Sequence, residues 1–223
     1  LLGGSSFVGR NLADYIGKER IVSTFFKKNL PNGLFFDITK MDVAEILNKY
    51  KNIHSAIILI SESNHEKCKN EPNIAKAINI TGLKKLIQQL IKRRIKPIFI
   101  STQLVFDGHK GNYIENDKPR PIINYAKQKL EIENFLLQNC KNCLIFRLSK
   151  ICGDRFEDNT LFSNFAKDIL ANNKIKCATN QTFAPVLAYE AAKAITTAME
   201  KNLEGIFHIG GPESITRIEC LYL

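Results

Sequence analysis

Short apolar runs alternate along the chain with stretches whose hydrophobic residues recur every three or four positions. The short runs are rich in β-branched, aromatic and large aliphatic residues, which is typical of strands, and the most apolar of them fit strands buried on both faces of a sheet. On this basis we expect strands at residues 21–26, 34–36, 56–60, 98–101 and 144–148.

The remaining stretches have the spacing of amphipathic helices. Pro72 opens the longest of them and Pro97 stands beyond its end. Thr39 and Asp42 form a capping-box pattern, which predicts the start of another helix that runs to about residue 50. Further helices are expected over residues 72–94, 125–138, 160–172 and 188–201.

Repeated alternation of strands and helices predicts an α/β fold with a doubly wound parallel sheet. The pattern loosens after Gly153, so we expect one domain at residues 1–153 and a smaller C-terminal lobe at residues 154–223, interleaved with the first. Leu1 and Leu2 directly precede a glycine turn and have the character of the end of a buried strand. We therefore expect the sequence to be a fragment, truncated at both ends. Ligands of such folds bind at the carboxyl ends of the strands.

Composition narrows the class of protein. Of the 223 residues 44% are hydrophobic, and the sequence holds no apolar stretch of the length that crosses a membrane. The formal net charge is +10. Its densest run, residues 92–96, closes a predicted helix, where cations stabilise the helix dipole, and it has no aromatic platform for nucleic acid. We expect an anionic small molecule as partner, with neither nucleic acid nor membrane.

Cysteine and histidine spacing indicates no metal site. Only Cys140 and Cys143, of six cysteines, form a C-x-x-C pair, which lies in a predicted helix-to-strand turn, and zinc needs four ligands. The four histidines stand apart from acidic clusters. Reduced thiols and the lack of a secretory signal favour a cytoplasmic location.

A glycine turn joins the first strand to the first helix: G-G-S-S-F-V-G at residues 3–9. Gly3 allows the tight turn, Gly9 allows close packing of helix and strand, and the helix N-terminus presents free N–H groups to a pyrophosphate. Ser6 takes the place where a middle glycine is usual. The turn predicts a dinucleotide site.

The end of the second strand carries Lys27 and Lys28 rather than an acidic residue. An acid there would hold a ribose 2′-hydroxyl, whereas cations, with help from Arg10, suit a 2′-phosphate. This favours NADP(H) over NAD(H). Asp37 follows the next strand, either near the adenine or at the start of a turn.

Tyr125 and Lys129 are four residues apart at the start of a helix and project from one face. A nearby ammonium and the helix N-terminus are expected to lower the phenol pKa, which makes Tyr125 a usable general acid or base. The same ammonium can bind the nicotinamide ribose. Thr102, at the end of a strand, can hold the substrate oxygen. These three residues are the predicted catalytic group.

The motifs together resemble the dTDP-4-dehydrorhamnose reductase branch of the extended short-chain dehydrogenase/reductase family, which has a Rossmann-type fold. Residues 101–108 read S-T-Q-L-V-F-D-G where that branch shows S-T-D-Y-V-F-D-G. Other matches are Tyr113, Glu115, Pro121, an N-x-x-G helix at Asn79, the strand exit from Arg147 to Gly153, the segment at residues 180–185, and a late strand at residues 205–209.

The resemblance implies reduction of a 4-keto group on a nucleotide-activated deoxysugar by a nicotinamide cofactor. Tyr125 would protonate the forming alkoxide, Thr102 would orient that oxygen, and Lys129 would tune Tyr125. The predicted cofactor-binding residues are Gly3, Ser5, Ser6, Phe7, Val8, Gly9, Arg10, Lys27, Lys28, Asp37, Ile38, Ile60, Ser61 and Lys129. The predicted substrate-binding residues are Thr102, Val105, Phe106, Tyr125 and Gln181.

Three departures from the branch affect the substrate more than the reaction type. Gln103 and Leu104 replace Asp-Tyr, residues 59–61 read L-I-S instead of N-A-A, and Lys150 and Cys152 replace an aromatic pair. Two alternatives stay open: a nucleotide-sugar epimerase or dehydratase of the same fold, and a non-catalytic, NADP-binding regulatory subunit. A homodimer is a further option.

Overall fold

The computed structural model describes residues 1–50 and 52–222. Its α-helices are α1 (Phe7–Ile16), α2 (Ala44–Leu47), α3 (His65–Asn70), α4 (Pro72–Lys76), α5 (Leu83–Lys92), α6 (Asn124–Asn139), α7 (Leu161–Leu170) and α8 (Ala188–Glu200). Its strands are β1 (Thr24–Phe25), β2 (Leu34–Phe35), β3 (Ser55–Ile58), β4 (Lys96–Thr102), β5 (Leu144–Leu148), β6 (Ile151–Cys152), β7 (Thr182–Phe183), β8 (Val186–Leu187), β9 (Gly205–Ile209) and β10 (Ile215–Thr216).

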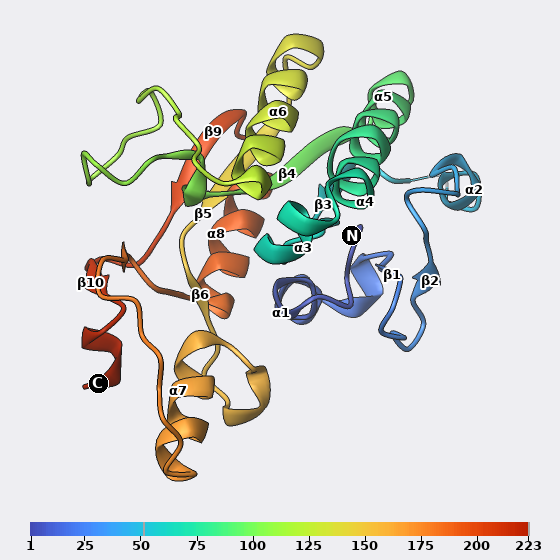
Figure 1. The fold of residues 1–223 in the computed structure, drawn as a ribbon. Coiled ribbons are helices and arrows are strands. Elements are labelled where there is room, and N and C mark those ends of the chain that lie inside the picture. Colours follow the sequence, from blue (N-terminus) through green and yellow to red (C-terminus); the bar gives the residue numbers. More distant parts are fainter. Residues whose placement is uncertain (51, 223) are drawn as a thin grey trace.

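The centre of the fold is a parallel sheet in the order β3, β4, β5, β9. Leu2 extends it through a parallel bridge to Ile58, and the carbonyl oxygen of Leu1 accepts a 2.9 Å hydrogen bond from the N–H of Thr24 in β1. β1 pairs in parallel with β2. The first strand position therefore lies in the middle of the sheet, and the α/β, Rossmann-type prediction is confirmed (Figure 1).

Helices cover both faces of the sheet because successive strand residues point to opposite sides. Ile98 packs with Leu12 of α1 and Ile195 of α8 on one face. Phe99, the next residue, packs with Ile132 of α6 on the other. Figure 1 shows α4, α5 and α6 together over one face of the sheet.

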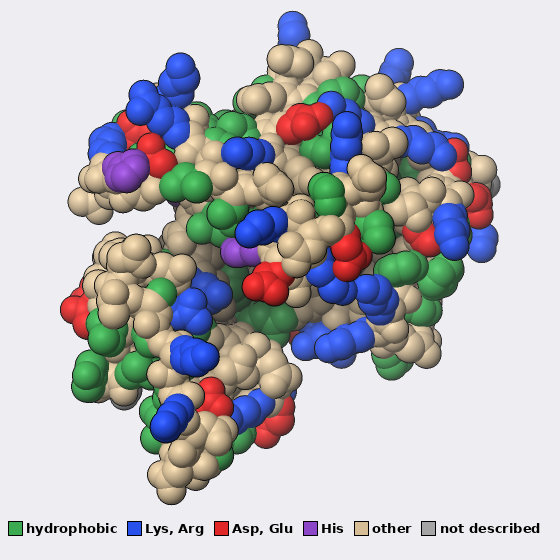
Figure 2. Space-filling model, viewed as in Figure 1, with side chains coloured by type: hydrophobic (Ala, Val, Ile, Leu, Met, Phe, Trp, Pro, Cys, Tyr) green, Lys and Arg blue, Asp and Glu red, His purple; other side chains and the backbone are tan. Residues whose placement is uncertain are grey.

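The residues after Gly153 divide between the sheet and a separate small cluster. β9 pairs with β5, and α8 packs against α1. In the cluster, Phe165 of α7 packs with Phe183 and Cys220. Figure 1 shows α7 and β10 set apart from the sheet, and the space-filling view shows a hollow on that side of the molecule (Figure 2).

The predicted long helix is not a regular α-helix. α4 and α5 are joined by a π-helical turn, Ala77–Gly82, in which Asn79 is buried. A Cβ on Gly82 would lie 2.9 Å from Cγ1 of Ile38, so the missing side chain lets this helix approach the segment after β2. Hydrophobic spacing does not distinguish a π turn from an α turn.

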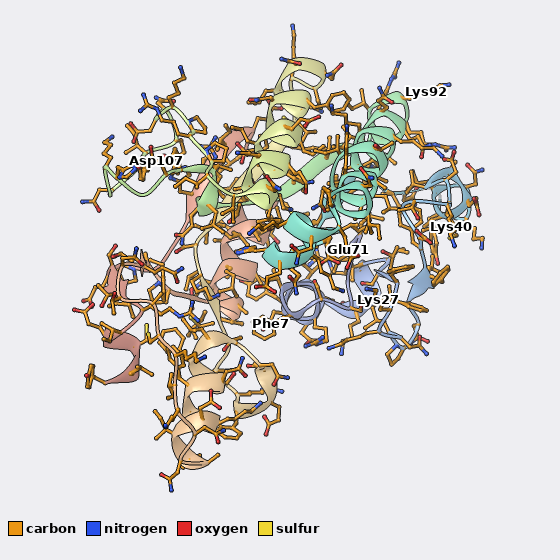
Figure 3. All side chains as sticks on the ribbon, in the orientation of Figure 1. Phe7, Lys27, Lys40, Glu71, Lys92 and Asp107 are labelled. Carbon is orange, nitrogen blue, oxygen red and sulfur yellow. The ribbon has the colours of Figure 1, made fainter. Side chains whose placement is uncertain are left out.

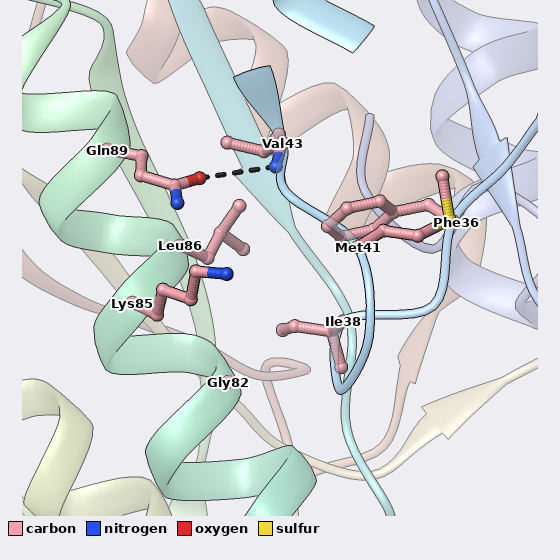
Figure 4. A pocket seen from close by; sticks show the side chains of 8 residues that line it. All are labelled: Phe36, Ile38, Met41, Val43, Gly82, Lys85, Leu86 and Gln89. Atoms are coloured by element: carbon pink, nitrogen blue, oxygen red, sulfur yellow. Dashed lines mark hydrogen bonds between the residues drawn. The ribbon is translucent and has the colours of Figure 1, made fainter. Parts of the chain in front are cut away.

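The predicted helix start at Thr39 is wrong. The N–H and hydroxyl of Thr39 both donate to Oδ1 of Asp37, at 2.9 and 2.6 Å, and this local turn competes with helix formation. α2 begins only at Ala44. The N–H of Val43 donates to Oε1 of Gln89 at 3.2 Å, which fastens the segment to α5 beside a small hollow (Figure 4).

The other elements follow the expected order with shorter ends. The two early strands shrink to two residues each, and the predicted loop after Thr102 includes a 3₁₀ turn, Gln103–Val105. Within residues 1–50 and 52–222, no helix has the length and apolarity to span a membrane. The same residues bring together no group of three acidic, histidine or cysteine side chains able to hold a metal.

Candidate active site

The glycine turn has the geometry expected of it. Gly3 has φ +91°, and its N–H donates to Oγ1 of Thr24 at 3.0 Å. A Cβ on Gly9 would lie 2.6 Å from the carbonyl oxygen of Gly3, so only glycine fits where α1 crosses the turn. The turn and the helix N-terminus thus leave the close approach that a pyrophosphate requires.

Ser6 caps α1, since its Oγ accepts a 3.1 Å hydrogen bond from the N–H of Gly9. Arg10 is exposed and donates to the carbonyl oxygen of Ser5 at 2.8 Å. Phe7 is the first residue of α1, and Figure 3 labels it beside this helix. Val8 is half-buried and packs against the core that includes Leu12 of α1 and Ile195 of α8.

Lys27 and Lys28 are exposed just beyond β1. Figure 3 shows Lys27 in the region of β1 and α1, on the side of the glycine turn. Asp37 is buried after β2 and is engaged by Thr39, as a turn residue would be. Ile38 is buried against Gly82.

A short path connects the glycine turn to Tyr125. A Cβ on Gly3 would lie 3.3 Å from the backbone nitrogen of Ile60. The next residue, Ser61, donates to Oδ1 of Asn79 at 3.3 Å, and its side chain lies close enough to Tyr125 to lower the pKa of the phenol. The predicted dinucleotide site and the predicted general acid are therefore neighbours.

Lys129 is buried and its Nζ donates to the carbonyl oxygen of Ile100 at 2.8 Å. The same Nζ lies 5.8 Å from the centre of the Tyr125 ring. Tyr125 lies one helical turn before Lys129, at the start of α6. Thr102 lies two residues after Ile100, at the carboxyl end of β4. Because a helix that follows a parallel strand runs back along it, the three predicted catalytic residues face the same sheet edge.

The expected direction of the Tyr125 pKa shift is wrong. Burial raises the pKa of Tyr125 to about 12, and the nearby Ser61 side chain opposes only part of this rise. Burial also lowers the pKa of Lys129 to about 8, while the charge of Glu133 opposes that shift. The sequence pattern predicted a cation near the phenol, but it could not predict how strongly the fold buries Tyr125 and Lys129.

The buried ammonium of Lys129 has a consequence for stability. Its pKa is about 8 when folded and 10.5 in the reference state, so between these values the unfolded chain binds more protons than the folded chain. Stability relative to a Lys129→Met variant should therefore rise with pH from 8 to 10.5, by up to about 3 kcal/mol. Urea denaturation of both proteins over this range measures the difference, with exposed Lys92→Met as the matched control. A pH-independent difference between wild type and Lys129→Met would contradict the assignment.

The predicted substrate-binding residues differ in their exposure and contacts. Val105 is fully buried, and Phe106 stacks on Tyr113 with ring centres 4.3 Å apart, so both pack inside the protein. Gln181 is exposed, and its Oε1 accepts a 3.0 Å hydrogen bond from Nη1 of Arg217. Thr102 and Tyr125 lie at the catalytic edge, and Val105 and Phe106 closely follow Thr102 in the sequence.

Two features of the site were missed from the sequence. His65, the first residue of α3, stacks on Tyr125 with ring centres 5.4 Å apart. A buried ion pair of 2.7 Å joins Glu133 of α6 to Arg147 of β5, and Ser101 of β4 also donates to Glu133. Neither follows from local spacing, since the partners are 14 to 60 positions apart in the sequence.

His208 is also not isolated from acidic groups. Its N–H donates to Oε1 of Glu115 at 2.8 Å, and its ring lies 3.4 Å from Nη1 of Arg147. This histidine joins β9 to the loop before α6 and to the buried ion pair. The predicted late strand corresponds to β9, which contains His208. The contacts of His208 could not be predicted, because they depend on the pairing of β9 with β5.

The sheet, the glycine turn and the Tyr125–Lys129 helix occur together in the extended short-chain dehydrogenase/reductases, and the chain is a protein of this class. Within that class, residues 1–220 match the model of the RmlD substrate binding domain. The chain belongs to this family, as the sequence resemblance predicted.

Among curated relatives, the chain is 30% identical over 185 residues to "Probable low-salt glycan biosynthesis reductase Agl14" of Haloferax volcanii, covering 81% of the chain and 61% of that protein. It is 27% identical over 173 residues to "Methionine adenosyltransferase 2 subunit beta" of Bos taurus, covering 74% and 52%. The chain thus spans between half and two thirds of these relatives.

Solved structures have the same fold. A hypothetical dTDP-4-dehydrorhamnose reductase from Sulfolobus tokodaii superposes with a TM-score of 0.88 at 27% identity, covering 99% of the chain and 79% of that structure. The dTDP-4-dehydrorhamnose reductase of Bacillus anthracis, in complex with NADP, gives a TM-score of 0.86 at 22% identity, covering 99% and 77%.

Proposed function

We propose that the protein reduces a 4-keto group on a nucleotide-activated deoxysugar, with a nicotinamide cofactor as hydride donor. One observation carries the proposal: Lys129 is buried behind Tyr125 at the carboxyl edge of the sheet, and Ser61 connects that edge to the glycine turn. The reductases among the relatives and solved structures support the same reaction.

The residues present fit a dinucleotide. A Cβ on Gly9 would meet the backbone of Gly3 and Gly4, so the glycine lets α1, capped by Ser6, pack closely on the turn that would hold the pyrophosphate. When bound, the nicotinamide supplies the hydride. The chain supplies the proton: with a pKa of about 12, the Tyr125 hydroxyl is protonated at neutral pH and can donate to the oxygen of the reduced carbonyl. The Thr102 hydroxyl, at the end of β4, would orient that oxygen.

The proposal includes a preference for NADP(H). Its support is the exposed pair Lys27 and Lys28 beyond β1, together with the NADP complex of one solved relative. Lys27→Ala combined with Lys28→Ala should weaken NADPH binding about tenfold or more and NADH binding by less than threefold, because only the former carries a 2′-phosphate. Fluorescence titration of both cofactors measures this.

The matched control for this pair is Lys92→Ala combined with Arg93→Ala, two adjacent exposed cations at the end of α5. Figure 3 shows Lys92 at the upper right of the view, well above Lys27. The control should leave both affinities unchanged. Equal losses for NADPH and NADH in the Lys27 and Lys28 variant would refute the 2′-phosphate assignment.

The reaction itself is tested with the full-length protein, NADPH and nucleotide-linked 4-keto deoxysugars. We expect NADPH to be consumed in a one-to-one ratio with the hydroxyl product. Product formed without net consumption of cofactor would instead indicate an epimerase or dehydratase, which regenerates its cofactor within each turnover.

A second candidate is a non-catalytic subunit, because curated relatives include methionine adenosyltransferase 2 subunit beta from several vertebrates. It would predict cofactor binding without turnover of any ketone, and binding to a methionine adenosyltransferase in a pull-down with the purified enzyme. A cytoplasmic location is part of either proposal. It is supported by the six cysteines, which are free and within the described residues.

A further inference from the structure

Lys150 stands at the catalytic edge of the sheet, one strand away from Thr102. In the β4–β5 register Thr102 is paired with Leu148, and Lys150 follows two residues later. Its backbone is fixed by the N–H of Val186, which donates to the Lys150 carbonyl oxygen at 3.0 Å. The residue is exposed, although its ammonium is partly shielded from water, as the lowering of its pKa by desolvation indicates.

Two other basic side chains face the same place from different elements. His65, on α3, stacks on the Tyr125 ring, and its pKa is lowered first by burial and then by the charge of Lys150. Arg217, which follows β10, acts on Lys150 in the same way and lowers the Lys150 pKa, after the larger effect of desolvation. Lys150 therefore lies between the catalytic tyrosine and the C-terminal lobe.

These basic groups lack acidic partners. None of the ion pairs formed within residues 1–50 and 52–222 includes Lys150, His65 or Arg217. Arg217 donates from Nη1 to the neutral side chain of Gln181, and its guanidinium lies 5.9 Å from the centre of the Phe165 ring. Its Nε is buried without a hydrogen-bond partner among the described residues.

Lys150 and Arg217 are cations that repel each other, and Arg217 has a buried N–H without a partner; both features cost stability unless a ligand supplies the missing charge. In the space-filling view, Lys and Arg side chains gather where the C-terminal lobe borders the hollow (Figure 2). The protein thus has a positively charged hollow near Tyr125, the proposed proton donor, and Nε of Arg217 is a hydrogen-bond donor there without a partner among the described residues.

We propose that Lys150, flanked by His65 and Arg217, binds an anionic substituent on the sugar ring of the substrate, such as a carboxylate. The inference rests on the proposed function, since it specifies the substrate of the same site. A sugar substituent fits better than the diphosphate bridge. Tyr125 and Thr102 address the reacting ring carbon, and Lys150 and His65 are the basic groups placed next to them.

Binding of paired probes tests this proposal. The full-length protein is saturated with NADP⁺, and the affinities of the glucose and glucuronate forms of UDP and dTDP are measured by calorimetry. The members of each pair share base, ribose and diphosphate and differ by a carboxylate at C6. We expect the glucuronate form of the accepted nucleotide to bind wild type about tenfold more tightly than its glucose form.

Lys150→Met should remove most of this preference by weakening glucuronate binding about tenfold and glucose binding by less than twofold. Lys150→Arg should keep it. Lys141→Met, an exposed lysine in the turn before β5, should change neither affinity. Because Lys150 is exposed, its variants are expected to fold, and thermal denaturation verifies this.

Equal losses for both probes in Lys150→Met would place the cation on the diphosphate and overturn the proposal, as would the absence of any preference in wild type. In both cases the proposed function survives, because the nucleotide sugar still binds. If wild type binds NADP⁺ but none of the four nucleotide sugars, the inference fails together with the nucleotide-sugar part of the proposed function.

Discussion

Tyr125→Phe is expected to lower turnover by about 10²–10⁴-fold, which is the contribution of a positioned general acid. The variant removes one hydroxyl and keeps the ring that stacks on His65. Cofactor affinity should change by less than threefold, because the glycine turn is untouched. Steady-state assays with NADPH and the ketone substrate, together with cofactor titration, measure the two effects separately.

The matched control for this variant is Tyr189→Phe, which removes an exposed hydroxyl on α8. It should turn over at the wild-type rate. If Tyr125→Phe is as active as wild type, the phenol does not carry the proton. If it loses cofactor binding along with activity, the hydroxyl has a structural role instead.

Arg147→Met is expected to lower the free energy of unfolding by about 3–5 kcal/mol, the usual cost of leaving one member of a buried ion pair without its partner. Arg147 and Glu133 are almost completely buried, and two nitrogens of the guanidinium, Nε and Nη2, contact Oε2 of the carboxylate at 3.1 and 2.7 Å. The variant would leave that carboxylate without its cation between α6 and β5. Urea denaturation, at an unchanged dependence on denaturant, measures the loss.

Two further variants separate the ion pair from general damage to the core. Lys18→Met breaks an exposed pair with Asp14 and should cost less than about 1 kcal/mol. Glu133→Leu combined with Arg147→Met removes both charges and should recover at least half of the loss of the single variant. If the double variant is as unstable as the sum of both single variants, the two charges are not coupled.

The site shows why a sequence locates a catalytic helix better than it predicts the state of its groups. The spacing of Tyr125 and Lys129 places both on one helical face regardless of the rest of the fold. Their pKa values depend on desolvation, which is a property of everything packed around them. The phenol pKa is therefore raised although a cation was correctly expected nearby.

The same distinction separates the correct and the wrong elements. Buried strands such as β4 and β5 were predicted well, since a strand covered on both faces must be apolar throughout. The π turn at Asn79 and the late start of α2 were not, because both depend on hydrogen bonds to other segments or on local side-chain competition. In these places the same hydrophobic spacing fits more than one backbone conformation, such as an α turn or a π turn.

By itself the sequence determined the α/β class, the glycine turn at Gly3 and Gly9, and the Tyr125–Lys129 helix, because each follows from residue type at short spacing. Only the tertiary structure decided that His65 stacks on Tyr125, that Glu133 and Arg147 are paired, and that Lys150 follows the strand residue paired with Thr102. Those contacts join segments that are distant in sequence. They exist because the order of strands in the sheet and the crossing of the helices bring such segments together, and no local pattern encodes that order.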